Sequence, residues 1–176
     1  LGLQPQRPYQ GKEKDPAYTI MVTYELSHEF MLDEYGNQDP SKPRWFSEDL
    51  PLHNLEADRA RSTKRYNAID PVGTVDGDWE QLIGYPCQVM ITKVPDKKND
   101  GYFKNYVGDV SGALSVPNYD QPTLVNTAKV FDLDNPNKEV LESLPNWIQD
   151  KIKTNLEYAD SPLAVLLGDS NGEAPT

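Results

Sequence analysis

Residues 82–113, with the sequence LIGYPCQVMITKVPDKKNDGYFKNYVGDVSGA, predict a β-hairpin around which the rest of the chain is organised. In its first half, Cys87, Val89 and Ile91 alternate with residues of different character. This period-two pattern is typical of a strand with one buried face. The polar run 96–101 ends in glycine and predicts the turn, because glycine adopts turn backbone angles at little steric cost.

The return strand, expected at 102–110, gives the first indication of function. Two tyrosines flank a lysine on one of its faces, beside further lysines in the turn. Such a face suits single-stranded nucleic acid, because bases stack on aromatic rings and cations meet phosphates. The alternative is that tyrosine and phenylalanine are present simply as good strand formers on a half-buried sheet. The predicted faces are Tyr102, Lys104, Tyr106 and Gly108 on one side and Phe103, Asn105, Val107 and Asp109 on the other.

The composition indicates a soluble protein that is not an enzyme. No apolar run approaches the roughly 20 residues that span a bilayer, and no signal-peptide pattern opens the sequence. Cys87 is the single cysteine, and His28 and His53 have no partner at metal-ligand spacing. The sequence also has no Walker loop, GxSxG or HExxH motif. We therefore expect no catalytic residues, no metal and no cofactor.

The formal net charge of −11 argues at first against a nucleic-acid ligand, because phosphate contacts require lysine and arginine. The cations are not spread evenly, however, and a local basic patch can bind phosphate on an acidic protein. Two clusters are apparent: Arg59, Arg61, Lys64 and Arg65 in the middle of the chain, and Lys93, Lys97, Lys98 and Lys104 around the hairpin.

The residues before the hairpin predict two more strands and a helix. The runs 17–26 and 44–52 are rich in β-branched and aromatic residues, which favour strands. We expect a long turn between them at 27–43, and a surface helix from His53 or Asn54 to about residue 66. The second strand opens with another basic and aromatic cluster: Lys42, Arg44, Trp45 and Phe46.

This order predicts a mainly β protein with a five-stranded OB-fold barrel whose helix lies between strands 3 and 4. The first strand is not recognisable, and we expect it to be missing or truncated. Segment 7–16 would then join strands 1 and 2, and 95–101 would join strands 4 and 5. These two loops border the binding groove of an OB fold. Both are basic, and the first carries Arg7, Lys12 and Lys14.

The residues after 113 predict a helical extension. An amphipathic helix beginning near Pro145 places Trp147, Ile148 and Ile152 at helical spacing, which is more typical of a packing surface than of a cofactor site. We expect three regions: an OB-fold nucleic-acid-binding domain at 1–113, a C-terminal extension with this helix at 114–160, and a flexible acidic tail at 161–176.

Several of these stretches resemble the small OB-fold single-stranded DNA-binding proteins of tailed bacteriophages. The resemblance lies in LGLQPQRPYQGKEK, VTYEL, RWFSEDLPLH, LIGYPCQVMITKV and YFKNYVGDVSG, and in FDLDNPN through SLPNWIQDKIK. It implies a protein that coats single-stranded DNA during replication and recombination in the cytoplasm of the infected bacterial host. It also implies phage replication or recombination proteins as partners. An acidic tail ending in an aromatic residue is not found here, because Asp169 and Glu173 are the only acidic residues of a tail that ends in Pro-Thr.

The leading hypothesis is sequence-nonspecific binding of single-stranded DNA without catalysis, with bases on aromatic rings and phosphates on cations. The residues expected to bind nucleic acid are Arg7, Lys12, Lys14, Lys42, Arg44, Trp45, Phe46, Arg61, Lys64, Arg65, Lys93, Lys97, Lys98, Tyr102, Lys104 and Tyr106.

Two alternatives remain open. One is a protein-interaction or virion-associated module, in which the helix with Trp147 docks a partner or forms a homo-oligomer. The other is a metal-dependent nuclease built on Asp76, Asp78 and Glu80. That acidic turn lacks an accompanying catalytic lysine or histidine, and acidic turns are usually solvated.

Overall fold

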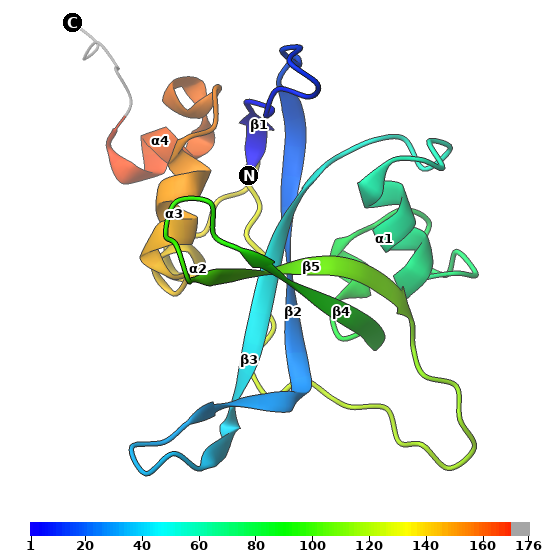
Figure 1. Cartoon of the computed structure of the whole chain (residues 1–176). Coiled ribbons are helices and arrows are strands. Elements are labelled where there is room, and N and C mark those ends of the chain that lie inside the picture. Colours follow the sequence, from blue (N-terminus) through cyan, green and yellow to red (C-terminus); the bar gives the residue numbers. More distant parts are fainter. Residues whose placement is uncertain (170–176) are drawn as a thin grey trace, which may run out of the picture. The chain divides into compact units, whose positions relative to one another are not determined.

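The computed structural model describes residues 1–169 (Figure 1). The protein is mainly β with a few helices, as the sequence predicts. One α-helix, followed by a short 3₁₀ helix, lies between the third and fourth strands, which is the predicted order. The strands are β1 (Gly2–Gln4), β2 (Ala17–Leu32), β3 (Gln38–Pro51), β4 (Cys87–Pro95) and β5 (Phe103–Gly112). The helices are α1 (Arg61–Ile69), η1 (Glu80–Leu82), α2 (Lys138–Glu142), α3 (Asn146–Lys153), η2 (Tyr158–Asp160) and α4 (Pro162–Leu167).

The five strands belong to two sheets. One sheet has the order β1-β2-β3, and the other is the β4–β5 hairpin. The pairs β1–β2 and β4–β5 are antiparallel. Within residues 1–169 no strand pairing joins the two sheets, so the strands do not close into the expected barrel.

The chain divides into two compact units. The first comprises Leu1–Ile20 and Lys129–Thr176, and the second comprises Met21–Ala128. This division does not follow the boundaries predicted at residues 113 and 160, because the first strand packs with the C-terminal helices. Strand β2 begins in the first unit and continues into the second.

In the first unit, β1 provides the strand that the sequence did not reveal. It pairs with the start of β2, and segment 5–16 joins the two strands. On its other side, the Leu3 N–H donates to Asn155 Oδ1 at 2.9 Å, and the Leu156 N–H donates to the Leu3 carbonyl at 2.9 Å. Gly2 has a φ of +71°, and a Cβ there would collide with the Asn155 side chain. A three-residue strand is therefore held by contacts distant in sequence.

Helices α2, α3 and α4 of the first unit each bury apolar side chains. Leu141 of α2, Ile148 and Ile152 of α3 and Leu163 of α4 are buried. The helix expected near Pro145 is confirmed as α3. The flexible tail predicted from residue 161 is wrong for its first part, because Ser161 caps α4 and Leu163 is fully buried. Residues 170–176 of the predicted tail lie outside the described residues.

The second unit has its core between β2 and the hairpin. Tyr24, Val107 and Val110 are buried together. Phe46 of β3 and Val89 of β4 are partly buried against them. Val89 of β4 belongs to the alternating pattern that predicted its strand, whereas Val107 and Val110 of β5 are three residues apart.

Strands β2 and β3 extend well beyond the predicted bounds, so the long turn expected at 27–43 is wrong. The actual turn is confined to residues 33–37, where the Asp33 carboxylate accepts the N–H groups of Tyr35 and Asn37 at 2.9 and 2.8 Å. Gly36 supplies a φ of +84°. Pro40 and Pro43 indicate a turn in the sequence, but β3 is at the edge of its sheet, where proline is tolerated.

Helix α1 begins later than expected and is not a surface helix. Asn54 caps a turn rather than the helix, because its Oδ1 accepts the Glu56 N–H at 2.8 Å. The helix begins at Arg61 and buries Ser62, Thr63, Arg65 and Tyr66. The charged run that predicted a solvated face therefore contains a buried arginine.

Candidate nucleic-acid interface

The β4–β5 hairpin has two distinct faces. Val89 pairs with Val110, and Ile91 pairs with Val107, on the face that packs on the core. We call the opposite face the outer face. Its residues, identified by cross-strand pairing, are Gln88, Met90, Thr92, Lys104, Tyr106, Asp109 and Ser111.

A β-bulge interrupts the predicted alternation on β5. Met90 pairs with Asp109 and Ile91 with Val107, which leaves Gly108 as an extra residue. The bulge brings Asp109 onto the same face as Tyr106, although the strict alternation places them on opposite faces. A Cβ on Gly108 would collide with the Thr92 hydroxyl and press on Met90, so only glycine fits.

Aromatic side chains are exposed toward the tip of the hairpin. Tyr102 is 71% exposed, Phe103 55% and Tyr106 49%. Cross-strand pairing places Tyr106 beside Lys104 on the outer face and Phe103 on the opposite face, as the sequence predicts. Tyr102 precedes β5 and belongs to the turn, where its carbonyl accepts the Asp96 N–H at 2.7 Å. The exposed rings at this tip can act as stacking surfaces, because they are not buried in the hydrophobic core.

Lysines accompany these rings. Lys93 Nζ lies over the Phe103 ring, 4.6 Å from its centroid. Lys104 Nζ lies 2.9 Å from Asp96 Oδ1. The backbone N–H of Lys98, together with hydrogen bonds from Lys104 and Asn99, lowers the pKa of Asp96 to about 2. Hydrogen bonding to this carboxylate raises the pKa of Lys104, so its ammonium stays charged at neutral pH. Lys97 and Lys98 are in the turn, and Lys98 is exposed.

The predicted cluster on β3 is only partly a surface. Trp45 is 41% exposed, while Phe46 packs against the core of Tyr24 and the valines. Phe46 is therefore a core residue and not the base-stacking residue that the sequence predicted. Arg44 Nε donates to the Phe30 carbonyl at 3.2 Å, and Lys42 Nζ lies 3.0 Å from Asp39. Both cations are exposed and keep part of their hydrogen-bonding capacity.

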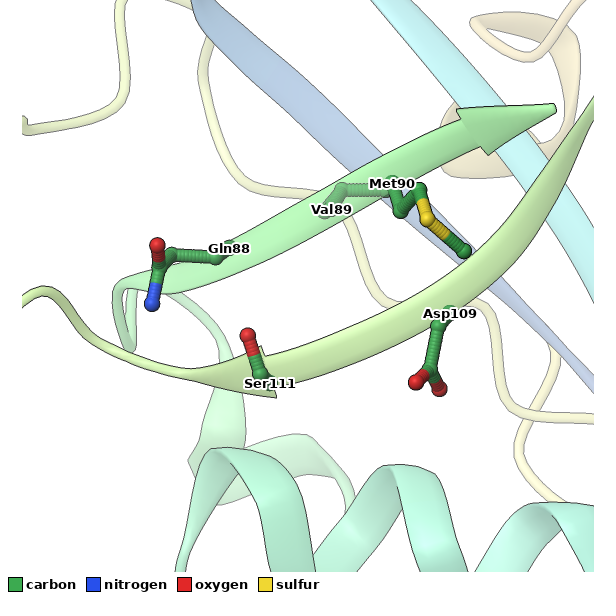
Figure 2. Close-up of a pocket in the computed structure, with 5 residues that line it drawn as sticks. All are labelled: Gln88, Val89, Met90, Asp109 and Ser111. Atoms are coloured by element: carbon green, nitrogen blue, oxygen red, sulfur yellow. The ribbon is translucent and has the colours of Figure 1, made fainter.

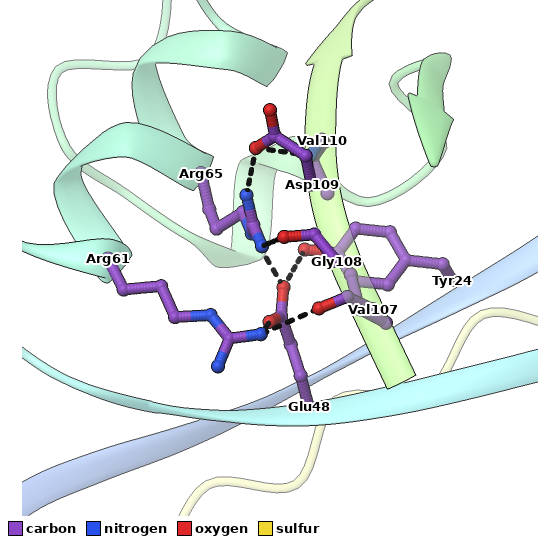
Figure 3. A network of polar contacts seen from close by, with 8 residues as sticks. All are labelled: Tyr24, Glu48, Arg61, Arg65, Val107, Gly108, Asp109 and Val110. Atoms are coloured by element: carbon purple, nitrogen blue, oxygen red, sulfur yellow. Dashed lines mark hydrogen bonds and ion pairs between the residues drawn. The ribbon is translucent and has the colours of Figure 1, made fainter. Parts of the chain in front are cut away.

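Arg65 of α1 is an interior residue and not a phosphate-binding one. It is 3% exposed. Figure 3 shows its guanidinium pointing into a polar network between α1, β3 and β5. Arg65 Nε donates to Glu48 Oε1 at 2.9 Å, and the other nitrogens donate to Asp109 Oδ1 at 2.6 Å and to the Gly108 carbonyl at 3.1 Å. Burial disfavours the charged form, but these bonds outweigh it and raise the pKa of Arg65.

The same network includes a tyrosine from β2 and a second arginine from α1. Tyr24 Oη donates to Glu48 Oε1 at 2.9 Å, and burial together with this carboxylate raises the pKa of Tyr24. Arg61 pairs with Glu48 Oε2 and donates to the Val107 carbonyl at 2.8 Å. The Arg61 side chain is still half exposed, and Lys64 is exposed. The sequence does not predict this network, because the partners of Glu48 are distant in sequence and come from β2 and α1.

The basic loop of the first unit has its own arrangement. Tyr9 and Lys12 form an isolated bridge, with N–H to carbonyl distances of 2.9 and 3.0 Å. Lys14 Nζ lies 5.0 Å from the centroid of the Tyr9 ring. Arg7, Lys12 and Lys14 are all exposed. A cation and an aromatic ring therefore lie together in this loop as well.

A carboxylate on β2 holds a segment that lies a hundred residues later in the chain. Glu25 accepts the N–H groups of Val125 and Asn126 at 2.7 and 3.1 Å, and the Asn126 side-chain amide at 2.6 Å. Burial raises the pKa of Glu25, but these donors outweigh that effect and lower it overall. No pattern around residue 125 could identify a partner a hundred positions away.

The acidic turn considered for a nuclease has a local structural role. Asp78 accepts the Glu80 N–H at 2.9 Å and the Gln81 side-chain amide at 2.6 Å, so it orders the start of η1. Among residues 1–169, no three His, Cys, Asp or Glu side chains gather in a group able to hold a metal ion. In the same residues, no helix has the length and apolarity needed to cross a membrane.

A scan of protein-family models and searches of curated proteins and solved structures found no match to this chain. Function is therefore inferred from the residues themselves. The structure brings together the lysines and rings of the hairpin, and it removes Arg65 and Phe46 from the predicted surface.

Proposed function

We propose that this protein binds single-stranded DNA without strong sequence preference and without catalysis. The observation that carries the proposal is the hairpin tip, where Tyr102, Phe103 and Tyr106 are exposed beside lysines. Each ring can stack on a base, which contributes about 1–3 kcal/mol and requires no base-edge recognition. The lysines supply the salt-sensitive phosphate contacts.

The order of elements supports this proposal. Three strands, a helix and a hairpin follow one another as in an OB fold, and the turn between the last two strands borders the binding groove in that fold. The turn at 96–101 carries Lys97 and Lys98. We propose that the second unit is an open relative of this architecture, held together by the Arg65 network rather than by barrel closure.

We assign to the interface the aromatic rings and cations whose side chains are at least partly exposed. Tyr102, Tyr106 and Trp45 would stack on bases. Phe103 is included because its ring is 55% exposed and carries a lysine, Lys93, on one face. The phosphate contacts would come from Lys42, Arg44, Arg61, Lys64, Lys93, Lys97, Lys98 and Lys104. Arg7, Lys12 and Lys14, in the loop of the first unit, are also predicted to contact phosphates.

The biological setting follows from the family resemblance. We propose a bacteriophage protein that coats exposed single strands during replication and recombination in the host cytoplasm. Its acidic net charge of −11 fits this task, because repulsion away from the local cations limits indiscriminate binding to duplex DNA.

The direct test is fluorescence anisotropy with a labelled oligo-dT and a duplex of the same length, at about 50 and 200 mM salt. We expect tight binding to the single strand, weakened at the higher salt. Equal affinity for the duplex, or no binding at low salt, would refute the proposal. Retention of affinity at the higher salt would argue against phosphate contacts.

A second function is favoured by one observation in the first unit. Trp147 of α3 is 47% exposed, and Leu156, Val165 and Leu166 are also exposed. Exposed apolar side chains on a helical unit are typical of a protein-binding surface. In that case the unit would bind a replication partner or a second copy, and high salt would leave the interaction intact. Sedimentation of the protein alone at low and high salt measures self-association.

A further inference from the structure

The outer face of the hairpin contains a depression that the proposed function has not used. Its volume is about 320 Å³, and Gln88, Val89, Met90, Asp109 and Ser111 line it. The lining residues come from both strands (Figure 2). It lies immediately next to Tyr106, because the Met90–Asp109 pair follows the Thr92–Tyr106 pair across the bulge.

The depression combines an apolar part with hydrogen-bonding groups. The Met90 side chain is 57% exposed and offers an apolar contact surface for a flat ring. Asp109 Oδ1 accepts from Arg65 and from the Val110 N–H. Among the described residues Oδ2 has no hydrogen-bond donor.

The other polar side chains that line the depression can also form further hydrogen bonds. Gln88 Nε2 donates to the Gly112 carbonyl at 2.9 Å, which fixes the amide and leaves its oxygen as an acceptor. Within residues 1–169 the Ser111 hydroxyl has no hydrogen-bond partner. The rim therefore presents two acceptors, one charged, and a hydroxyl that can accept or donate.

From this chemistry we infer that the depression is a subsite for one nucleobase of the bound strand and that it prefers guanine. Guanine presents adjacent N–H donors, from N1 and the exocyclic N2 amino group, on its Watson–Crick edge. Thymine presents a single donor there, flanked by two carbonyl oxygens that the Asp109 carboxylate would repel. Single-stranded bases are commonly read along this edge while their faces contact flat or apolar side chains.

The bulge is what makes the subsite continuous with the stacking surface. Gly108 turns Asp109 toward Tyr106, and the Arg65 network holds the carboxylate in place. The Val110 N–H and Arg65 hold the pKa of Asp109 below its usual range, so it accepts hydrogen bonds at neutral pH. This inference depends on the proposed single-strand binding, because the base is delivered by a strand stacked on Tyr106.

The test compares oligonucleotides of about 15 nucleotides, near the upper site size of one OB fold. Anisotropy is measured with oligo-dT and with the same strand carrying one central guanine or hypoxanthine, which lacks the N2 amino group. We expect guanine to increase affinity about fivefold over thymine, at the lower end for a good base contact. Hypoxanthine should give an intermediate affinity.

Asp109→Asn is the sharpest variant. Because Arg65 requires an acceptor, the new amide will keep its oxygen toward Arg65 and turn its NH₂ group into the depression. The guanine preference should then be lost, while oligo-dT affinity changes less than about twofold. Ser111→Ala and Gln88→Ala are outside the buried network, so they test the subsite even if Asp109→Asn does not fold. Each should reduce the guanine preference.

The outcomes separate the two proposals. Salt-sensitive oligo-dT binding with no guanine preference would overturn the subsite and leave the proposed function intact. Absence of binding to every strand would overturn both. A guanine preference that persists in all three variants would place it elsewhere on the protein and overturn this assignment.

Discussion

The base of the β4–β5 hairpin packs on the core and on α1, whereas its tip is exposed to solvent. At the base, Val107 and Val110 pack on Tyr24, and Arg65 is enclosed by Glu48 and Asp109. At the tip, Tyr102 and Tyr106 are exposed and the lysines face solvent. The lesson is that residue type does not distinguish a fold residue from a binding residue. The face of the hairpin on which a side chain lies does, as the adjacent residues Tyr106 and Val107 show.

The largest effect is expected at the base, from Arg65→Ala. Removing the guanidinium leaves Glu48 buried without its main partner. Breaking a buried ion pair in this way costs about 3–5 kcal/mol. Urea unfolding should show this loss in the free energy of unfolding.

Lys64→Ala is the matched control for that experiment, because Lys64 neighbours Arg65 on α1 and is exposed. Its stability should stay within about 0.5 kcal/mol of the wild type. An equally small effect of Arg65→Ala would contradict the assignment of Arg65 to the fold.

The next effect is expected at the bulge between base and tip. Gly108→Ala places a methyl group against the Thr92 hydroxyl and near the Met90 carbonyl. Overpacking of this kind costs about 1–3 kcal/mol. Thermal unfolding should detect it, with exposed Asn105→Ala on the same strand as control. If alanine is tolerated at 108 at no cost, the bulge is adjustable and does not fix the position of Asp109.

At the tip we expect a substitution to lower the affinity for oligo-dT and to leave the free energy of unfolding nearly unchanged. Tyr106→Ala removes a half-exposed ring that does not belong to the core. Oligo-dT affinity should fall by about 1–3 kcal/mol, while urea unfolding is nearly unchanged. Tyr35→Ala, in the β2–β3 turn with an 81% exposed ring, is the control and should bind as the wild type does. Equal losses for both tyrosines would mean that no specific stacking surface exists at the tip.

The smallest effect concerns the ion pair of the turn. The folded pKa of Asp96 is lowered to about 2, below its unfolded value. Its contribution to stability is therefore complete above the unfolded pKa and is lost as pH falls toward 2. Asp96→Asn should unfold more easily than the wild type at about pH 6, and the difference should shrink near pH 3. A difference that does not depend on pH would show that the carboxylate charge is irrelevant there.

The sequence was sufficient to predict the elements whose pattern is local. The hairpin, the order of strands and helix, and α3 all follow from periodicity and from turn residues. It was also sufficient to place Tyr106 and Lys104 on one face, because alternation holds between the turn and the bulge.

The remaining features depend on distant partners. The Arg65 side chain is buried because Glu48 and Asp109 come from two other strands, whereas by sequence it resembles its exposed neighbours. Strand β1 has only three residues, and it is held by pairing with β2 and by a hydrogen bond to Asn155. The bulge at Gly108 changes which residues share a face, and a glycine in a strand indicates a bulge without proving one.

The most direct test of the hairpin as a binding surface is photo-crosslinking to oligo-dT that carries 5-iododeoxyuridine, followed by mass spectrometry of the linked peptides. The iodinated base links to aromatic side chains on which it stacks. We predict links to Tyr102 and Tyr106 at the exposed tip, reduced by higher salt. Links confined to Trp147 or Tyr9, with none in 102–106, would contradict the assignment of the hairpin tip as the binding surface.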